Sequence, residues 1–303
     1  MILKRLLISL LLHAFLLSTN LSWAQSERDF ALSLYRSGEY EYSSIEIRRW
    51  LYINRHDPFS PYMQYLLALS YGRIGRYAEA VSTLRDLIES LTELGEGSPY
   101  AKILCESHLQ LLNLHFRERR FDDFFIEKES FAISCVDPEQ RLEAAAQRMT
   151  VAVHVYSRSW DEALMALGEA DLLDRETFEE VSREIAEMNE YKPRNPVLGG
   201  ILSLLPGLGY LYGGLGAAGL RSFFINAACV GITVFCFVMG MPVLGVLFAV
   251  IEGVLYFSNI YGGVNAVIRH NADFVLERRD SILKLLSIPP LDVITLREQV
   301  YGQ

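Results

Sequence analysis

Positive charge is scarce in this chain. Its 303 residues include 28 Lys and Arg against 37 Asp and Glu, which gives a formal net charge of −9. Proteins that bind nucleic acids cluster Lys and Arg, because phosphate contacts need cations. The composition therefore predicts that no nucleic acid is a partner. Cysteine is also rare, and the four cysteines form no CxxC pair, so the sequence predicts neither a disulfide scaffold nor a zinc site.

Motifs of the common enzyme classes are missing as well. The sequence contains no Walker loop, no nucleophile elbow, no HExxH and no dinucleotide fingerprint. Gly207 and Gly209 lie in an apolar stretch that no Lys-Ser/Thr pair follows, so they do not predict a phosphate cradle. We expect a protein that is not an enzyme, with no metal, no cofactor and no catalytic residues.

Charge nearly disappears between Pro196 and Ile268. This stretch has two formally charged residues, Arg221 and Glu252, and holds 14 of the chain's 21 glycines. Hydrophobic residues make up 51% of the whole chain, and much of that excess is concentrated here. The sequence therefore predicts a water-soluble part followed by a part that sits among membrane lipids.

The first 24 residues have the pattern of a secretory signal peptide. Lys4 and Arg5 precede an apolar run, and Ser22 and Ala24 are small residues at the −3 and −1 positions of a cleavage site. The run is too short to cross a ~30 Å hydrocarbon core comfortably. We expect cleavage before Gln25 and export of the following domain; an uncleaved anchor is the alternative.

Residues 25–191 contain a degenerate repeat with helical spacing and no strand pattern. Four segments share an aromatic or His residue, a turn, a second aromatic residue and then an acidic residue: 35–40, 71–80, 115–124 and 154–163. Their turn positions are 37, 44 and 39 residues apart: Gly38, Gly75, Arg119 and Arg158. Such a period predicts an all-α domain of helical hairpins, each of which must stack on its neighbours to bury its apolar face.

This pattern resembles the tetratricopeptide repeat, a helix–turn–helix unit of about 34 residues. The match is best over 61–94, where six residues occupy the family's packing positions: Ala68, Tyr71, Gly75, Ala80, Leu84 and Leu87. The resemblance implies a solenoid of four hairpins closed by a helix near 174–190. Its concave groove, lined by the first helix of each hairpin, would bind a protein or peptide partner.

Three arginines share one repeat position and are expected to face this groove: Arg36, Arg73 and Arg117. Three aromatic residues are expected nearby: Tyr62, Tyr65 and Phe116. A column of arginines would hold peptide carboxylates through bidentate hydrogen bonds. The alternative is that these arginines are the solvated ends of amphipathic helices.

His115 and His154 share another repeat position, and we expect them in the core between helices rather than on a metal. Cys105 begins the third hairpin and Cys135 ends it. Because antiparallel helix ends lie side by side, a disulfide between them is reasonable in an oxidising compartment. Two buried thiols are the alternative.

Three apolar stretches follow the helix-breaking residues 192–196: 197–212, 220–239 and 243–267. The second and third are long enough to cross a bilayer, whereas the first is short and interrupted by Pro206. We expect a membrane module over 192–268 with two or three crossings, and a C-terminal helical tail over 269–303. Two crossings would return the tail outside, and three would place it in the cytoplasm.

Small residues recur at four-residue spacing along the first and third stretches, which lets helix backbones approach closely. These faces either pack within a small helical bundle or bind another membrane protein or a second copy of the chain. Residues 204–214, Leu-Leu-Pro-Gly-Leu-Gly-Tyr-Leu-Tyr-Gly-Gly, resemble the PGxGxxYxG opening of TM2-domain-like modules, and 252–266 resemble the second half of one. The aspartate that usually ends a TM2 domain is not evident.

Together with the repeats, this resemblance implies an inner-membrane protein of the Gram-negative envelope. Its repeat domain would lie in the periplasm and would bind a partner during the assembly of envelope or membrane proteins.

Glu252, Tyr256 and Asn259 lie on one face of the third stretch at helical spacing. A carboxyl group near the middle of a bilayer is costly to ionise and is usually paired, protonated or functional. Arg221 is expected about 12 Å away along the axis, too far for easy pairing. We expect a protonated Glu252 that hydrogen-bonds to Tyr or Asn; the alternative function is a transporter or channel subunit with Glu252 as an intramembrane polar site.

Overall fold

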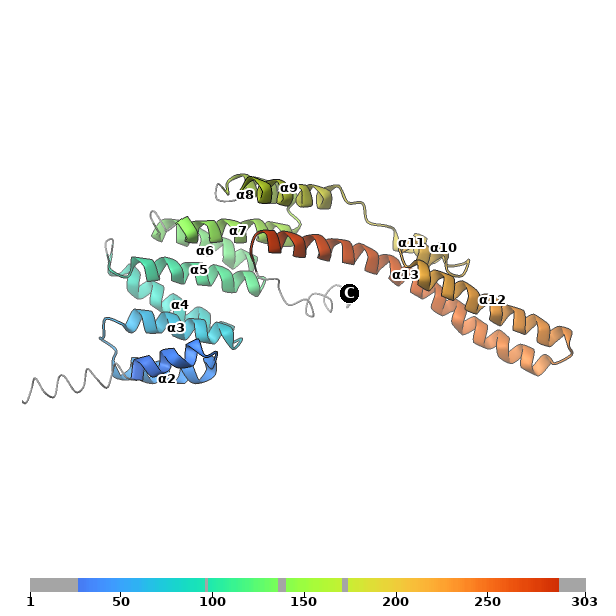
Figure 1. The fold of residues 1–303 in the computed structure, drawn as a ribbon, viewed down its shortest axis with the longest axis horizontal. Helices are drawn as coiled ribbons and strands as arrows, with labels where there is room; N and C mark the ends of the chain where they lie inside the picture. Colours follow the sequence, from blue (N-terminus) through green and yellow to red (C-terminus); the bar gives the residue numbers. More distant parts are fainter. Residues whose placement is uncertain (1–26, 96–97, 136–139, 171–173, 289–303) are drawn as a thin grey trace, which may run out of the picture. The chain divides into compact units, whose positions relative to one another are not determined.

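The computed structural model describes residues 27–95, 98–135, 140–170 and 174–288, and within them all regular secondary structure is helical (Figure 1). The all-α prediction is therefore confirmed. The predicted signal peptide, 1–24, and the end of the predicted tail from 289 lie outside the described residues. The chain forms two compact units, Met1–Val153 and His154–Gln303.

The first unit consists of successive helical hairpins. Its first helical residues are 27–36. They are followed by α2 (Tyr40–Ile53), α3 (Ser60–Arg73), α4 (Tyr77–Thr92), α5 (Ala101–Arg117), α6 (Phe121–Ser134) and α7 (Gln140–Ser157), whose last turn belongs to the second unit. From α2 to α6 each helix packs on the next, and α3 also packs on α5. The first helices of the second and third hairpins, α3 and α5, thus lie next to each other (Figure 1).

Each hairpin turns at the residue that the repeat alignment identified. The backbone has positive φ at all four of these positions: Gly38 (84°), Gly75 (76°), Arg119 (56°) and Arg158 (58°). The residue after each turn donates its N–H to a carbonyl in the last turn of the preceding helix, as Arg120 does to His115 at 2.8 Å. This is the hydrogen bonding of a Schellman-type helix end. The four turns are therefore equivalent, although two of them lack glycine.

The core of the first unit lies between the hairpins. Of the six residues at the predicted packing positions, five are at most 5% exposed: Ala68, Tyr71, Ala80, Leu84 and Leu87. The sixth, Gly75, forms the turn. Trp50 and Phe124 are large aromatic side chains in this core and are 2% and 0% exposed. Burial of such side chains is worth roughly 1.5–3 kcal/mol each, which favours stacked hairpins over separate ones.

The second unit begins with the end of α7 and continues with α8 (Trp160–Gly168), α9 (Arg175–Glu190), α10 (Pro196–Leu202), α11 (Leu208–Tyr212), α12 (Gly216–Val238) and α13 (Pro242–Leu285). Helix α9 is the helix expected near 174–190. Its N-cap, Asp174, accepts a hydrogen bond from the Thr177 amide at 2.9 Å. Asn195 caps α10 in the same way, with Pro196 in the first helical turn.

Helices α12 and α13 are long and apolar enough to cross a membrane, and they pack against each other. The stretch 197–212 instead forms α10 and α11, of 7 and 5 residues, because Pro206 and Gly207 interrupt it. Helix α13 has 44 residues, so it is about 66 Å long. It continues through 268 without a break, so the third apolar stretch and the helical tail are one helix.

Candidate functional site

The structure separates the residues predicted to line the groove. Tyr65 and Phe116 are buried, at 8% and 1% exposed, so their prediction as groove residues is wrong. These rings pack inside the stacked hairpins, where their apolar area is removed from water. Arg36, Arg73, Arg117 and Tyr62 are exposed.

The three arginines all end a helix. Helix α3 ends at Arg73, α5 ends at Arg117, and Arg36 is the last of the helical residues 27–36. A cation in the last turn interacts favourably with the partial negative charge of the helix C-terminus. The Arg73 guanidinium also lies 5.9 Å from the centre of the Tyr40 ring. The three arginines therefore share a repeat position in part because each one ends a helix. This agrees with the alternative interpretation, in which they are the solvated ends of amphipathic helices.

Arg36 also lines a pocket of about 490 Å³. The pocket has three walls: Arg28, Leu32 and Arg36 of the first helical residues, Phe59 and Tyr62 at the start of α3, and Tyr100 and Ile103 at the start of α5. Its volume lies within the range of about 300–1,000 Å³ that is typical of ligand-binding clefts. We call it the two-arginine pocket.

The walls of the two-arginine pocket are held by contacts within the protein. The Arg28 guanidinium lies 4.4 Å from the centre of the Phe59 ring, and its Nε and Nη2 are each 3.3 Å from Asp29 Oδ1. Tyr100 donates its hydroxyl hydrogen to the Pro58 carbonyl at 2.9 Å. Sequence reasoning identified Arg36 and Tyr62 but not this pocket, because its walls come from three separate segments.

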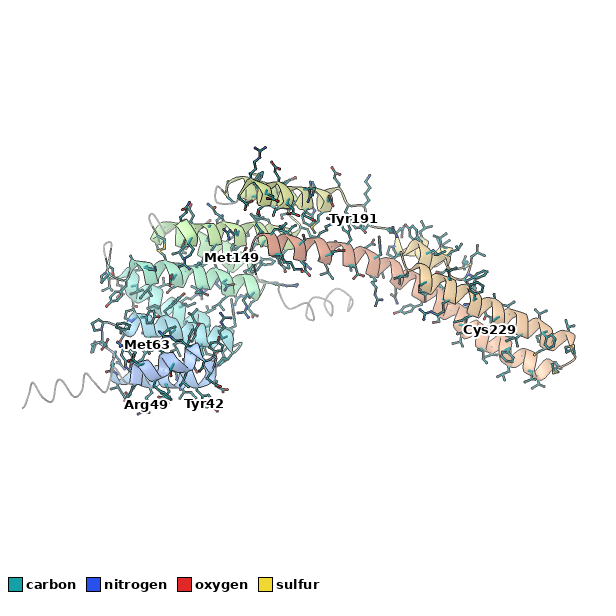
Figure 2. All side chains as sticks on the ribbon, viewed as in Figure 1. Tyr42, Arg49, Met63, Met149, Tyr191 and Cys229 are labelled. Carbon is teal, nitrogen blue, oxygen red and sulfur yellow. A yellow bond between two sulfur atoms is a disulfide. The ribbon has the colours of Figure 1, made fainter. Side chains whose placement is uncertain are left out.

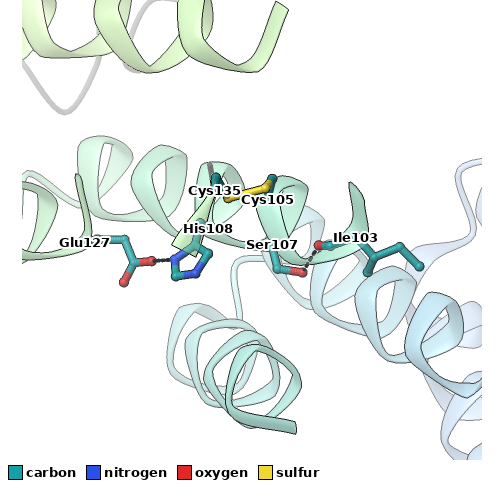
Figure 3. The surroundings of a disulfide bond; sticks show 6 residues. All are labelled: Ile103, Cys105, Ser107, His108, Glu127 and Cys135. Carbon is teal, nitrogen blue, oxygen red and sulfur yellow. Dashed lines mark hydrogen bonds and ion pairs between the residues drawn. A yellow bond between two sulfur atoms is a disulfide. The ribbon is translucent and has the colours of Figure 1, made fainter. Parts of the chain in front are cut away.

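Cys105 and Cys135 are joined by a disulfide, with Cα atoms 5.7 Å apart, at the open end of the third hairpin (Figure 3). One turn further along α5, His108 Nδ1 lies 2.5 Å from Glu127 Oε1, and both residues are buried. This pair was not predicted from the sequence. The contact gives each of these buried side chains a polar partner on the other helix of the hairpin, and neither residue lines the two-arginine pocket.

His115 is 1% exposed, as expected for a core histidine, and its Nδ1 lies 2.7 Å from the hydroxyl of Tyr77. Burial lowers the pKa of His115, although Asp123 and Glu127 oppose the shift. Burial thus favours the neutral imidazole, and the Tyr77 hydroxyl and His115 Nδ1 share a hydrogen bond in the core. His154 is half-buried.

In the second unit, Asn259 binds the segment between α10 and α11. Its Nδ2 donates to the Ser203 carbonyl at 2.7 Å, and its Oδ1 accepts from the Gly207 amide at 3.0 Å and the Ser222 hydroxyl at 2.7 Å. Tyr256 donates to the Leu204 carbonyl at 2.9 Å. The break at Pro206 leaves these backbone groups without helical partners, which is costly in apolar surroundings. Two residues of the predicted polar face therefore satisfy backbone groups.

Glycines allow α10 and α11 to pack closely on α12 and α13. A Cβ atom at Gly199 would lie 2.6 Å from Val267 Cγ2, and one at Gly213 would lie 2.6 Å from Ala266 Cβ. Gly207, with φ of 90°, packs against the Gly219 carbonyl oxygen. For the first apolar stretch, the small-residue face thus packs within the unit. Gly253 has no neighbouring atom where its Cβ would be.

Glu252 makes neither of the hydrogen bonds expected for it. Its Oε2 is buried without a hydrogen-bond partner among the described residues, and Tyr256 and Asn259 are bound elsewhere. The expected pairing of Glu252 is therefore wrong, because the interrupted backbone of 203–207 takes both partners.

The end of α13 packs on α9. Arg278 contacts Glu184 at 2.8 Å and Glu187 at 2.7 Å. The rings of Tyr191, at the end of α9 (Figure 2), and Phe274 are stacked with their centres 3.9 Å apart. This junction was not predicted, although the two acidic residues at i, i+3 on α9 are a signal for a basic partner.

Asn271 extends the junction toward α10. Its Oδ1 accepts from the Tyr191 hydroxyl at 2.9 Å and the Arg194 amide at 3.0 Å, and its Nδ2 donates to the Arg194 carbonyl at 2.8 Å. The chain between α9 and α10 is thereby held to α13 at both its side chains and its backbone.

Comparison with known proteins adds no assignment. No family model, no curated protein and no solved structure matches this chain. The tetratricopeptide-like and TM2-like identifications therefore stay predictions from the residues.

Proposed function

We propose that this protein is a membrane-anchored scaffold. Its tetratricopeptide-like hairpins form a solenoid that binds a protein or peptide partner in the periplasm, and its glycine-rich TM2-like module holds it in the bacterial inner membrane. Such a scaffold would assist the assembly of envelope or membrane proteins. The observation that best supports this proposal is the continuous helix α13, apolar at its start and bound to α9 near its end.

This helix favours two crossings over three. Only about 20 residues of a helix are needed to span a bilayer, so α13 is too long to lie wholly in lipid. Its charged end contacts α9, which precedes the membrane module in the chain. Both ends of the α12–α13 hairpin would thus leave the membrane on the same side, with α10 and α11 entering without crossing.

The pattern of the first 24 residues and the disulfide support a periplasmic position for the repeats. A disulfide such as Cys105–Cys135 persists in oxidising compartments and is rare in the cytosol. The proposal therefore places the repeats, the end of α13 and the first residues of the module on one side, and the turn at 239–241 on the other.

Cysteine labelling with a membrane-impermeant maleimide tests this topology in intact cells. We would introduce Glu162→Cys in α8, Lys284→Cys in α13 and Met239→Cys in the turn, one at a time, with the parent chain as control. We expect labelling at 162 and 284 without permeabilisation, and at 239 only after it. Labelling at 162 but not 284 would indicate three crossings, and labelling at 239 alone would place the repeats in the cytoplasm.

Site-specific photo-crosslinking tests partner binding. A photoreactive amino acid at Tyr62 or Arg117, on the first helices of hairpins, is expected to form an adduct with another protein in cells. The same group at the exposed Glu89 of α4 is the control and is expected to form none. Equal adducts at all three positions, or none, would contradict a partner groove.

Transport receives less support from the structure, because Tyr256 and Asn259 satisfy backbone groups rather than face one another across a path. The variant Glu252→Gln separates the two functions. For a scaffold, we expect this variant to keep the crosslink at Tyr62 and to insert normally into the membrane. If the protein instead conducts an ion or proton through Glu252, the variant would lose that transport activity.

A further inference from the structure

We infer that the two-arginine pocket binds an extended peptide segment in which a large apolar side chain lies between two carboxylates. This inference rests on the proposed function and names the chemistry of the partner. The two-arginine pocket would hold the apolar side chain, and Arg28 and Arg36 would hold the two acidic side chains.

The wall formed by the helical residues 27–36 sets the distance between the two arginines. Arg28, Leu32 and Arg36 follow one another at four-residue steps, so they lie along one face of the helical residues 27–36. Eight residues of helix place the two arginine Cα atoms about 12 Å apart, with Leu32 between them. The pocket therefore offers cation, apolar surface and cation in a row.

The other two walls are mostly apolar and are held in position. Phe59 and Tyr62 are in edge-to-face contact with their ring centres 5.8 Å apart. Tyr100 is fixed by its hydrogen bond to the Pro58 carbonyl, and Ile103 lies beside it on α5. Such a surface favours an aliphatic or aromatic side chain of the ligand.

The two arginines place positive charge at this pocket in an acidic chain. Arg36 is exposed and forms no ion pair with any residue that the structure describes. Arg28 is held against Phe59, with 19% of its side chain exposed, and its two contacts with Asp29 are long. Those contacts use Nε and Nη2, so among the described residues Nη1 makes neither of them and is the atom that we assign to a second carboxylate.

The spacing of the arginines matches an extended chain. A strand rises about 3.3 Å per residue and places alternate side chains on one face, so residues i, i+2 and i+4 lie on the same side over about 13 Å. The order acidic–x–apolar–x–acidic therefore places its three side chains opposite Arg28, Leu32 and Arg36. A segment with one carboxylate would contact only one of the two arginines.

Fluorescence anisotropy with labelled peptides and the full chain in detergent micelles tests this inference. The probe contains Glu-Ser-Leu-Ser-Glu within a Gly/Ser sequence; the comparison peptides contain Gln-Ser-Leu-Ser-Gln and Glu-Ser-Ser-Ser-Glu. We expect the Glu-Ser-Ser-Ser-Glu peptide to bind roughly tenfold more weakly, because it loses the apolar burial. The Gln-Ser-Leu-Ser-Gln peptide is expected to bind roughly a hundredfold more weakly, because it loses two charge-assisted contacts of about tenfold each. Equal affinity for the Glu and Gln peptides would overturn the inference.

Protein variants locate the site. Arg36→Gln is expected to weaken the Glu probe about tenfold and to leave the Gln peptide unchanged. Arg117→Gln, at the same repeat position but outside the pocket, is the matched control and should have no effect. Because both arginines are exposed, both variants are expected to fold, which the thermal midpoint verifies. An equal loss in both variants would overturn the assignment to this pocket.

Failure of the peptide-binding inference can be distinguished from failure of the proposed scaffold function. If no peptide binds but the photo-crosslink at Arg117 persists, the inference is wrong while a partner groove remains. If the crosslinks at Tyr62 and Arg117 are both missing, the proposed partner binding fails as well.

Discussion

Arg278 of α13 contacts Glu184 of α9 at 2.8 Å, across 94 residues of sequence. Glu184 is 6% exposed, so its carboxylate has lost most of its contact with water. Removing the cation would leave a buried charge without its partner, which costs more than the pair itself contributes. This pair is therefore central to the attachment of α13 to α9.

We expect Arg278→Met to lower stability by about 1–2 kcal/mol, because Glu184 loses its charged hydrogen bond. The thermal unfolding midpoint of the full chain in detergent measures this loss. Arg175→Met, which removes an exposed pair with Glu179 on α9, is the control and should leave the midpoint unchanged. Equal midpoints for the two variants would show that α9 does not depend on this contact.

Replacing Asn259 by Leu is expected to detach the segment 203–207 from α13. The Ser203 carbonyl, the Gly207 amide and the Ser222 hydroxyl would all lose a partner, and each such loss costs about 1–3 kcal/mol. We predict a lower thermal midpoint and faster proteolysis between α10 and α11. Asn265→Leu, at an exposed position on the same helix, is expected to be tolerated; equal damage from both changes would contradict this role of Asn259.

The turn at Gly75 tests whether the hairpins depend on backbone conformation. A Cβ there would meet no atom within 4 Å, so Gly75→Ala affects stability only through its φ of 76°. We expect a loss of about 1 kcal/mol. Gly168 has equal space but no positive φ, so Gly168→Ala should be neutral or stabilising because alanine favours helix. A stabilising Gly75→Ala would refute the argument.

His115 makes the first unit sensitive to acid. Burial lowers the pKa of His115 in the folded protein below the value of about 6.5 for an exposed histidine. As pH falls below about 6.5, the unfolded chain binds a proton first, so stability decreases. Above that pH both states are neutral at this residue and the effect vanishes. Denaturant unfolding between pH 5 and 8, compared with His115→Gln, measures it; identical pH dependence in both chains would exclude His115 as the cause.

Much of the fold was predictable from short-range patterns. The spacing of aromatic and acidic residues located the hairpin turns, including Arg119 and Arg158, which lack glycine. The turn recurs because each hairpin must reverse at the same point to bury the same face. Hydropathy likewise identified α12 and the start of α13, since twenty apolar residues in succession need no knowledge of the rest of the chain.

It was harder to predict which residues of the candidate sites are exposed and which groups they bind. Tyr65 and Phe116 have the residue type of groove aromatics but are buried, because hairpin stacking rather than the residue decides which face is exposed. Tyr256 and Asn259 were identified as a polar face, yet their partners are backbone groups 52–56 residues away. Every residue except proline has the same backbone amide and carbonyl groups, so the sequence does not indicate which of them a side chain will bind.

By itself the sequence determined the elements: helical hairpins with equivalent turns, two long apolar helices and an interrupted stretch before them. Those features depend on propensity, periodicity and local hydrogen bonds, which act within a few residues. The tertiary structure alone decided that Arg28 and Arg36 flank a pocket with the starts of α3 and α5, and that the end of α13 lies on α9. These contacts join distant residues, such as Arg28 with Phe59 and Arg278 with Glu184, and their free energy comes from apolar burial and paired charges that exist only once the chain has packed.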